Sequence, residues 1–350
     1  MNRRSFLSLA ALAPGIRLES SDEPSGSITD VEGVKVGHFT ETRRPTGCTV
    51  LLVEEGATGG VEQRGGAPGT RETDLLNPVN HVEKVNAIVL SGGSAFGLAT
   101  ADGVMRYLEE KGFGYQAGRV RVPIVPAAIL FDLGVGDSSI RPTAESGYKA
   151  CQAARATVPE QGNVGAGAGA TIGKMLGPGR AMKGGFGAAS VRLPNGLVVG
   201  AMVAVNAVGD VWDHIHGKLL AGARTEDGKH LADTMALMRQ GRLPAFSPRA
   251  THTTIGVVAT NAPLTKTQAA KMAQMADDGY ALAIRPVHTP GDGDTVFAVA
   301  TGRWKIEMED RWVGIIGALA ADVMAQAILS AVLHAKGISG YPSAADLEKG

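Results

Sequence analysis

The chain has 350 residues, which is long enough for one large domain or two ordinary ones. Its formal net charge is zero, and charged residues make up 19%, below the globular norm of about a quarter, so the composition favours neither nucleic-acid binding nor an acidic tail. Glycine is the outlier with 48 residues, roughly twice the usual share of about 7%. The glycines cluster at the ends of apolar runs, which is typical of tight turns and close backbone approach.

The first residues, MNRRSFLSLAALAPG, combine the pair Arg3-Arg4 with a short apolar stretch that ends near Ala13. This pattern is typical of a twin-arginine export signal, and the apolar part is too short to span a bilayer. A frayed amphipathic tail is the alternative. We therefore expect an exported, periplasmic protein, or a cytoplasmic one if the signal is not functional. Residues 1–27 would be the signal and a polar linker.

Hydrophobic periodicity then predicts the elements in chain order. Apolar, β-branched runs predict strands at 49–53, 87–90, 122–125, 197–205, 254–259 and 295–300. Helical spacing predicts helices at 95–111, 144–156, 266–278 (with Thr265 as N-cap) and 313–336. Pro286 limits the run YALAIRPVH to a short or edge strand. Because strands and helices do not alternate strictly, we expect an α+β fold with two stacked sheets inside and helices outside.

Two further features of composition are only weakly informative. The glycine-dense segment 162–190 would let backbone N–H groups approach a ligand or another strand, but it contains no GxxxxGK[ST] phosphate loop. Cys48 and Cys151 lie in no CxxC motif, and two cysteines cannot make a disulfide framework. Buried thiols are the simpler interpretation, and one structural disulfide is the alternative.

Three short motifs are candidate sites. Ser94 in SGGSAFGL lies between a predicted strand and helix, but the second glycine of a nucleophile elbow is missing, which favours a serine N-cap at a tight turn. His214 and His216 in DHIHG have no identifiable third metal ligand. Asp292 and Asp294 in PGDGDT lack the twelve-residue loop of a calcium site, and a turn with solvated carboxylates is the alternative.

The segment ATHTTIGVVATNAP, residues 250–263, places two threonines at the mouth of a predicted core strand, directly after a loop-like connection. A threonine hydroxyl is a poor nucleophile at neutral pH. A threonine that begins a chain, however, can use its own α-amine as general base. A backbone cut before Thr253 would create that arrangement. Since most threonines at strand starts are only good strand formers, these residues alone leave both interpretations open.

Longer motifs cover most of residues 28–335. They include ITDVEGVKVGHFT, VNAIVLSGGSAFGLATADGVMRYLEE, GNVGAGAGATIGK, KGGFGAAS, VVGAMVAVNAVGDV, TTIGVVATNAPLTKTQ and AIRPVHTPGDGDTVFAVATG. Together they resemble the L-aminopeptidase/D-amidase-esterase (DmpA-type) family and, more distantly, the ornithine acetyltransferases. The resemblance implies a four-layer αββα sandwich. It also implies a hydrolase whose precursor cuts itself in front of a Ser or Thr that begins a strand.

Carried onto this sequence, the resemblance implies a cut between His252 and Thr253. Residues 28–252 would form the large chain and 253–350 the small chain of one hydrolase domain. Thr253 would be the nucleophile, and Asn206 in VAVNAVGD would stabilise the oxyanion. Asp294 would orient the nucleophile and hold its ammonium form, with Asp292 as a second candidate.

The substrate implied by the resemblance is a short peptide, amino-acid amide or ester with a free N-terminus. Backbone groups around Gly92, Gly93 and Ser94, together with the glycine-rich segment, would line the pocket. The resemblance implies no metal and no organic cofactor. It suggests a homo-oligomer of cleaved pairs, with no nucleic-acid partner and no membrane attachment after export.

The sequence also departs from the family pattern. His252 stands where a small residue or Asn is more usual, and Phe131 and Asp132 stand where β-aminopeptidase-like members use a tyrosine. Pro290-Gly291 replaces bulky apolar residues. Two other classes stay open: an acyltransferase that passes the acyl group to an amine, and an uncleaved, non-catalytic binding protein of the same fold.

Overall fold

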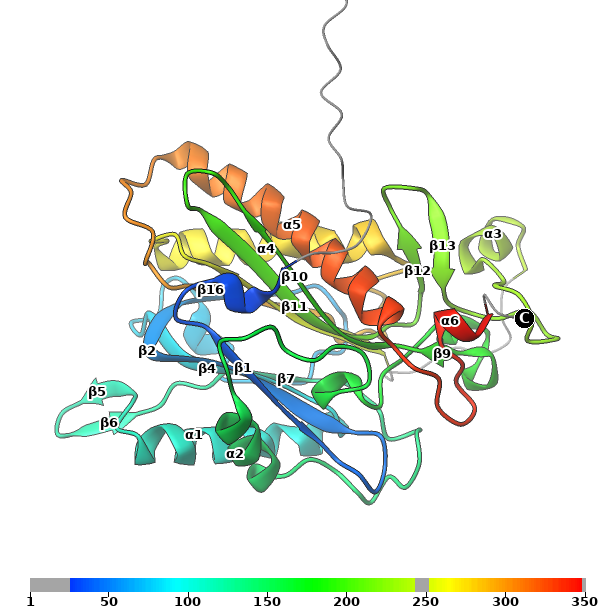
Figure 1. Ribbon diagram of the computed structural model, residues 1–350, viewed down its shortest axis with the longest axis horizontal. Helices are drawn as coiled ribbons and strands as arrows, with labels where there is room; N and C mark the ends of the chain where they lie inside the picture. Colours follow the sequence, from blue (N-terminus) through cyan, green and yellow to red (C-terminus); the bar gives the residue numbers. More distant parts are fainter. Residues whose placement is uncertain (1–25, 243–251, 348–350) are drawn as a thin grey trace, which may run out of the picture.

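The computed structural model describes residues 26–242 and 252–347. These residues form four layers, with a pair of helices on each outer face and two layers of strands between them (Figure 1). Helices α4 (Lys266–Ala283) and α5 (Asp310–Leu333) form one outer layer, and α1 (Thr100–Glu110) and α2 (Ala144–Ala153) form the other. This arrangement confirms the αββα sandwich expected from the resemblance.

The strands of both inner layers belong to one hydrogen-bonded sheet, in the order β10-β11-β14-β16-β2-β4-β7-β3, with β1 paired to β2. Strand β2 (Gly47–Gln63) joins the layers, because its beginning pairs with β1 and its end pairs with β16. The expected two stacked sheets are therefore connected through one long strand, and a register shift between Leu52 and Ala57 marks the change along its pairing with β4. The other strands of this sheet are β1 (Lys35–Thr40), β3 (Thr70–Arg71), β4 (Lys84–Ser91), β7 (Ala127–Ile129), β10 (Gly185–Arg192), β11 (Val198–Asn206), β14 (Thr253–Thr260) and β16 (Thr295–Ala300).

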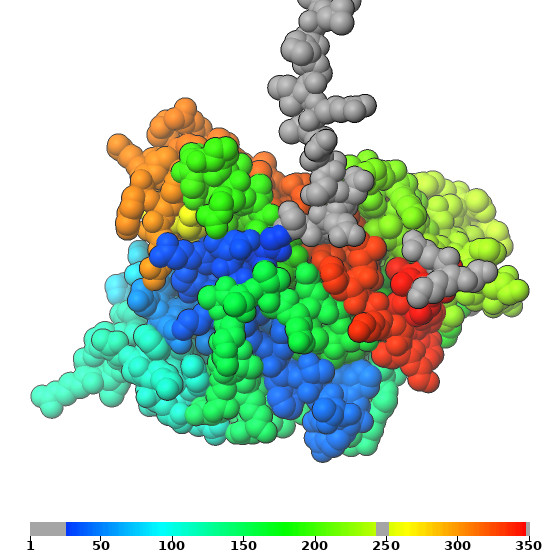
Figure 2. All heavy atoms as spheres, viewed as in Figure 1, coloured from blue at the N-terminus to red at the C-terminus, as the bar shows by residue number. Residues whose placement is uncertain are grey.

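Smaller elements lie around this body. The hairpin of β5 (Tyr115–Ala117) and β6 (Val120–Val122) projects from one end of the molecule, as Figure 2 shows. The remaining described elements are β8 (Thr171–Ile172), β9 (Met182–Lys183), β12 (Asp210–Asp213), β13 (Lys218–Ala221), β15 (Ile284–Arg285), α3 (Thr234–Arg239), α6 (Ala344–Leu347) and several short 3-10 turns.

Three apolar clusters fill the spaces between the four layers. The central cluster lies between the two strand layers and includes Met202, Val257 and Phe297. Neighbouring residues on the same strands, such as Val203 and Val258, face α4 and α5 instead. The third cluster joins β2 and β4 to α1 and α2. Strands buried on both faces have continuous apolar sequences, which is why β4, β11, β14 and β16 were predictable.

Several predicted elements change in the structure. The predicted helix 95–111 begins as a 3-10 helix, Ser94–Ala99, and Gly93 rather than Ser94 occupies the N-cap position. The predicted strand 122–125 is wrong, because β6 ends at Val122 in the exposed hairpin. The predicted N-cap is confirmed, since Thr265 accepts the backbone N–H of Gln268 in a capping box. Helix α4 then continues beyond the predicted end to Ala283.

The glycine surplus has a packing cause where β10 meets α5. A Cβ at Gly185 would lie 2.3 Å from the carbonyl oxygen of Ala331, and one at Gly187 would lie 2.1 Å from that of Ala327. Real Cβ atoms do not approach so closely, so glycine lets the helix backbone lie directly on the strand.

Helix α5 is the one helix in the described part of the chain whose length and composition would suit a membrane span. It packs against α4, β10 and β11, and most of its apolar stretch is buried. We therefore treat it as a core helix. Cys48 and Cys151 are both buried free thiols, as expected.

Candidate active site

Thr253 is the first residue of β14, in the middle of the sheet. Strand β14 pairs antiparallel with β11 on one side and parallel with β16 on the other. In this register Asn206 lies directly opposite Thr253, and such pairs have Cβ atoms ~4.5–5.5 Å apart. The fold therefore makes neighbours of two residues that the resemblance assigns to one site.

The Thr253 hydroxyl lies against the peptide group that precedes it. Its Oγ donates a hydrogen bond to the carbonyl oxygen of His252. The same carbonyl oxygen accepts the backbone N–H of Gly293 at 3.0 Å. A Cβ at Gly293 would lie 2.8 Å from the Thr253 Oγ, so glycine leaves room for the hydroxyl. The carbonyl of the His252–Thr253 bond is thus held and polarised beside a potential nucleophile.

Asn206 is held by contacts at both ends of its amide. Its Oδ1 accepts from Lys174 Nζ at 2.7 Å and from the backbone N–H of Thr171 at 3.0 Å. Its Nδ2 donates to the backbone carbonyl of Phe131 at 3.0 Å. An amide nitrogen has two N–H donors. These contacts fix the amide with its NH₂ group on the Phe131 side.

Lys174 also donates to the backbone carbonyl of Asn206, at 2.9 Å. Burial lowers the pKa of the Lys174 ammonium to about 7, although the nearby carboxylates of Asp292 and Asp132 act in the opposite direction. His252 is buried beside it, and burial together with the charge of Lys174 lowers the pKa of the imidazole to about 3.

Two carboxylates lie on the other side of Thr253, in the turn before β16. Asp294 Oδ1 accepts the backbone N–H of Thr254 at 2.7 Å, so it is tied to the second residue of β14. The backbone of Asp292 forms a β-bridge with His252, and its Oδ2 accepts the backbone N–H of Thr289 at 2.7 Å. Burial and the charge of Asp294 raise the pKa of the Asp292 carboxyl.

A second group of buried charges continues from Asp294 into the protein. Asp294 Oδ2 accepts the backbone N–H of His288 at 3.1 Å and contacts its Nδ1 at 3.0 Å. The Nε2 atom of His288 lies 3.3 Å from Asp277, whose carboxylate is 3.0 Å from Arg64 Nε. Burial raises the pKa of Asp277 to about 7. The row Asp294–His288–Asp277–Arg64 therefore links the site to the end of β2.

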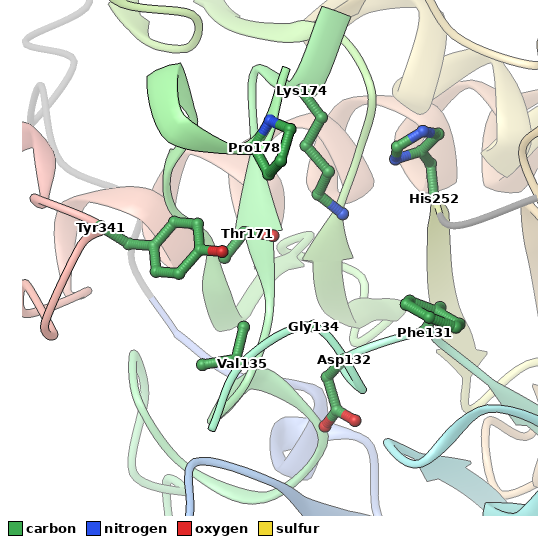
Figure 3. A pocket seen from close by; sticks show the side chains of 9 residues that line it. All are labelled: Phe131, Asp132, Gly134, Val135, Thr171, Lys174, Pro178, His252 and Tyr341. Carbon is green, nitrogen blue, oxygen red and sulfur yellow. The ribbon is translucent and has the colours of Figure 1, made fainter. Parts of the chain in front are cut away.

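A cavity of about 210 Å³ opens beside His252 and Lys174 (Figure 3). In the figure, Val135 and Tyr341 lie on the side away from His252. The side chain of Asp132 points away from the other lining residues. The residues that line the cavity are Phe131, Asp132, Gly134, Val135, Thr171, Lys174, Pro178, His252 and Tyr341.

The direction of Asp132 has a cause outside the cavity. Its Oδ1 accepts from Arg44 Nη2 at 2.6 Å and from the backbone N–H of Gly93 at 2.9 Å, and its Oδ2 accepts from Thr46 at 2.6 Å. Arg44 also donates to the backbone carbonyls of Asp132 and Val135, at 2.7 Å each. This buried pair fixes the loop that carries Phe131 and the cavity wall.

The structure places the predicted site residues in two groups. Thr253, His252, Asn206, Asp292 and Asp294 come together around one peptide group. By contrast, the glycine turn expected to bind substrate, residues 92–94, does not line the cavity and lies behind Asp132. Its backbone is used to bind that carboxylate, and a Cβ at position 92 would lie 2.2 Å from it.

Sequence reasoning missed Lys174 and Gly293. Lys174 sits in the glycine-dense segment, where the unusual signal is a lysine among small apolar residues in GATIGKML. Gly293 sits between the two noted aspartates, and its role depends on the approach of two separate strands. The histidines of DHIHG take no part in this site, and His216 Nδ1 pairs with Asp213 at 2.6 Å on an exposed turn.

Within the described ranges, no group of three or more His, Cys, Asp and Glu side chains is placed to hold a metal ion. The groups gathered around the His252–Thr253 peptide are a hydroxyl, an amide, a buried amine and paired carboxylates. This set suits acyl transfer, in which a nucleophile attacks a carbonyl and donors stabilise the oxyanion.

Comparisons with known proteins agree with this reading. The family model described as peptidase family S58 matches residues 26–345. A protein of Mycobacterium leprae named "uncharacterized aminopeptidase" is 45% identical over 346 residues, covering 91% of this chain and 93% of that protein. A 6-aminohexanoate-oligomer endohydrolase of Kocuria sp. is 30% identical over 317 residues, covering 86% of this chain and 84% of that enzyme.

Two solved structures share the fold. A β-aminopeptidase of Burkholderia sp. superposes with a TM-score of 0.68 at 22% identity, covering 93% of this chain and 94% of that one. The L-aminopeptidase D-Ala-esterase/amidase of Ochrobactrum anthropi, described as a variant of the Ntn hydrolase fold, gives a TM-score of 0.69 at 21% identity, covering 93% of each chain. The chain therefore belongs to peptidase family S58 and is a peptidase with an N-terminal-nucleophile hydrolase fold.

Proposed function

We propose that this peptidase cuts its own His252–Thr253 bond and then uses Thr253 to release N-terminal amino acids from short peptides, amides or esters. The observation that carries this proposal is the position of the Thr253 hydroxyl against the His252 carbonyl, whose oxygen also accepts the Gly293 N–H. A hydroxyl in that position is next to the atom that it has to attack.

In the self-cleavage step, the Thr253 Oγ attacks the carbonyl carbon of His252. A C–O bond forms, the C–N bond of the peptide breaks, and the hydroxyl proton ends on the nitrogen that leaves. The Gly293 N–H stabilises the negative charge that develops on the carbonyl oxygen. Breaking the C–N bond frees the α-amine of Thr253, and water then hydrolyses the ester, which frees the Thr253 hydroxyl and leaves His252 with a carboxylate. Lys174 supports this step by holding the Asn206 amide through its Oδ1.

In the mature enzyme, the α-amine of Thr253 would accept the proton of its own hydroxyl as this attacks a substrate carbonyl. Asn206 Nδ2 and the Gly293 N–H are the donors for the oxyanion, and Lys174 holds the Asn206 amide through its Oδ1. Asp294 binds the Thr254 N–H and so fixes the start of β14. The acyl group passes to Oγ while the amine leaves, and water then releases the acid.

The decisive experiment compares the two neighbouring threonines. Thr253→Ala should give one uncut band on a denaturing gel and no amidase activity. Thr254→Ala, which removes the neighbouring hydroxyl, should still give a small chain, and N-terminal sequencing of this band should begin at residue 253. Fully cut Thr253→Ala protein, or an active enzyme that stays one polypeptide, would contradict the proposal.

Export and assembly belong to the same proposal. The twin-arginine pattern lies outside the described residues, and it supports a periplasmic location. Replacing both Arg3 and Arg4 with Lys should leave the precursor in the cytoplasm, as measured by cell fractionation. We also propose a homo-oligomer of cleaved pairs acting on small peptides, with no nucleic-acid partner. Light scattering of the cut enzyme should give the mass of several cleaved pairs. A mass that corresponds to one cleaved pair would contradict the proposed homo-oligomer.

A further inference from the structure

The position of His252 in the cavity wall suggests what the cavity binds. His252 supplies the acyl group of the bond proposed to be cut, and its side chain is one of the residues that line the cavity. Self-cleavage and substrate hydrolysis would use the same nucleophile and the same oxyanion donors. A substrate must therefore place its carbonyl where the His252 carbonyl now lies, and its acyl side chain follows into the same space.

We propose that this cavity is the acyl-side binding site of the mature enzyme and that it takes one amino-acid residue with an uncharged, mainly apolar side chain. Val135, Pro178 and Tyr341 are the proposed specificity-determining residues. The inference rests on the proposed function, because it needs the substrate to follow the path of His252.

The charges around the cavity support an uncharged occupant. Among the described lining residues, Asp132 is the one carboxylate, and Arg44, Thr46 and the Gly93 N–H bind it from behind. The one ammonium group, that of Lys174, donates to both oxygens of Asn206. Burying a charged side chain without an opposite charge or hydrogen-bond partner is strongly unfavourable.

The walls support an apolar occupant of limited size. Phe131, Val135, Pro178 and Tyr341 present rings and aliphatic groups to the cavity (Figure 3). Its volume of about 210 Å³ is below the roughly 300–1,000 Å³ typical of sites for drug-sized ligands. One residue on the acyl side of the scissile bond fits these dimensions better than a longer peptide segment.

The test uses the purified, self-cleaved enzyme with p-nitroanilides of leucine, phenylalanine, lysine and glutamate. Leucyl and phenylalanyl substrates should be turned over with kcat/KM at least roughly tenfold above the lysyl and glutamyl ones, a difference of about 1.4 kcal/mol. Equal or better turnover of a charged substrate by the cut enzyme would overturn the proposal.

A charge placed in the wall should then change the preference. Val135→Asp should lower the leucyl-to-lysyl ratio of kcat/KM by roughly tenfold, because the new carboxylate can pair with a lysyl side chain. The matched control is Val79→Asp, since Val79 is 87% exposed and does not line the cavity; this variant should keep the wild-type ratio. An unchanged ratio in folded, self-cleaved Val135→Asp enzyme would overturn the proposal.

A milder variant covers the case in which the new carboxylate prevents folding. Val135→Leu should narrow the cavity and lower kcat/KM for the phenylalanyl substrate relative to the leucyl one, and no change in this ratio would count against the proposal. Self-cleavage is read separately on a denaturing gel. If the wild-type enzyme is cut and active but shows no side-chain preference, only the assignment of the cavity is contradicted. If the wild-type protein is neither cut nor active, both the proposed function and this inference are contradicted.

Discussion

Two lysines, nine residues apart in the glycine-dense segment, are buried in different surroundings. Lys174 donates to Asn206 and borders the cavity beside His252. Lys183 lies in β9 and donates to three backbone carbonyls, those of Gly167, Ala170 and Gly184, at 2.8–3.0 Å. Burial lowers the pKa of both ammonium groups to about 7.

The comparison shows that a perturbed pKa does not by itself identify a functional group. Lys183 binds only backbone in its described hydrogen bonds, and these hold the turns of the glycine-dense segment together. Lys174 binds a polar side chain that faces the proposed nucleophile. We infer that Lys183 serves the stability of the fold and that Lys174 serves the reaction. The predictions below separate these two roles.

The largest effect is expected from Lys174→Met. Loss of the ammonium removes the hydrogen bonds from Lys174 to both oxygens of Asn206 and so weakens the positioning of its amide. Removal of one oxyanion donor in comparable sites costs roughly 10²–10³-fold in kcat. We expect a loss of this order, together with slower appearance of the small chain. Stopped incubations followed on denaturing gels, with amidase assays of the cut fraction, measure both. Wild-type rates in this variant would assign Lys174 the same structural role as Lys183.

Lys183→Met should act on stability instead. Three buried carbonyls lose their donor, and an unsatisfied buried polar group costs about 1–3 kcal/mol. We expect the free energy of unfolding to fall by at least ~2 kcal/mol, while kcat of the folded, cut enzyme stays at the wild-type value. Urea unfolding and active-site-normalised kinetics test this. A large loss of kcat without loss of stability would reverse the assignment.

A smaller effect concerns pH. Because the pKa of each lysine falls from 10.5 to about 7 on folding, the unfolded chain binds more protons between these values, and these two groups make the free energy of unfolding rise with pH. In the Thr253→Ala background, which should remain one chain, we expect the rise between pH 7 and pH 8.5 to become shallower when Lys183→Met is added. An identical slope would show that Lys183 stays charged when buried.

The smallest effect is expected at His288, which binds Asp294 from behind. Burial opposes the charge on His288, but its hydrogen bond to Asp294 and the charges of Asp277 and Asp294 outweigh burial and the opposing charge of Arg64, so that its pKa is raised. A charge-assisted hydrogen bond is worth ~1.5 kcal/mol, so His288→Ala should lower kcat by roughly tenfold.

The pH profile distinguishes this positioning role from a general loss of packing. The contribution of a protonated His288 is present below its raised pKa and is lost as pH rises through it. The difference between wild type and His288→Ala should therefore shrink from pH 6 to pH 9. His288→Asn is the control, because it keeps a side-chain N–H and suits the positive φ of 55°. A pH-independent loss shared by both variants would indicate packing alone.

The sequence was sufficient for much of the sheet and for part of the site. Strands β11, β14 and β16 are buried on both faces, so their apolar runs are visible without knowledge of their partners. The threonine at the mouth of β14 and the asparagine at the end of β11 were identified through the family motifs. Their direct opposition follows from strand register, which the motifs do not contain.

Other parts depended on contacts between distant segments. The path of β2 through both strand layers was not visible, because local periodicity describes a strand's faces and not its neighbours. The turn at Gly92 was expected to bind substrate, yet its backbone faces Asp132 from behind the cavity wall. Lys174 resembled any other lysine until the fold buried it against Asn206.

The sequence by itself determined the buried strands, the start of α4 at its capping residue Thr265, and the identity of the candidate nucleophile. These depend on local periodicity, local hydrogen bonds and motifs that survive in the linear order of residues. Only the tertiary structure decided that the hydroxyl of Thr253 contacts the His252 carbonyl beside Gly293 and that Asn206 lies opposite Thr253. It also decided which of two similar lysines donates to Asn206. Burial and electrostatic environment are properties of a position in space, and they arise when segments far apart in the chain pack together.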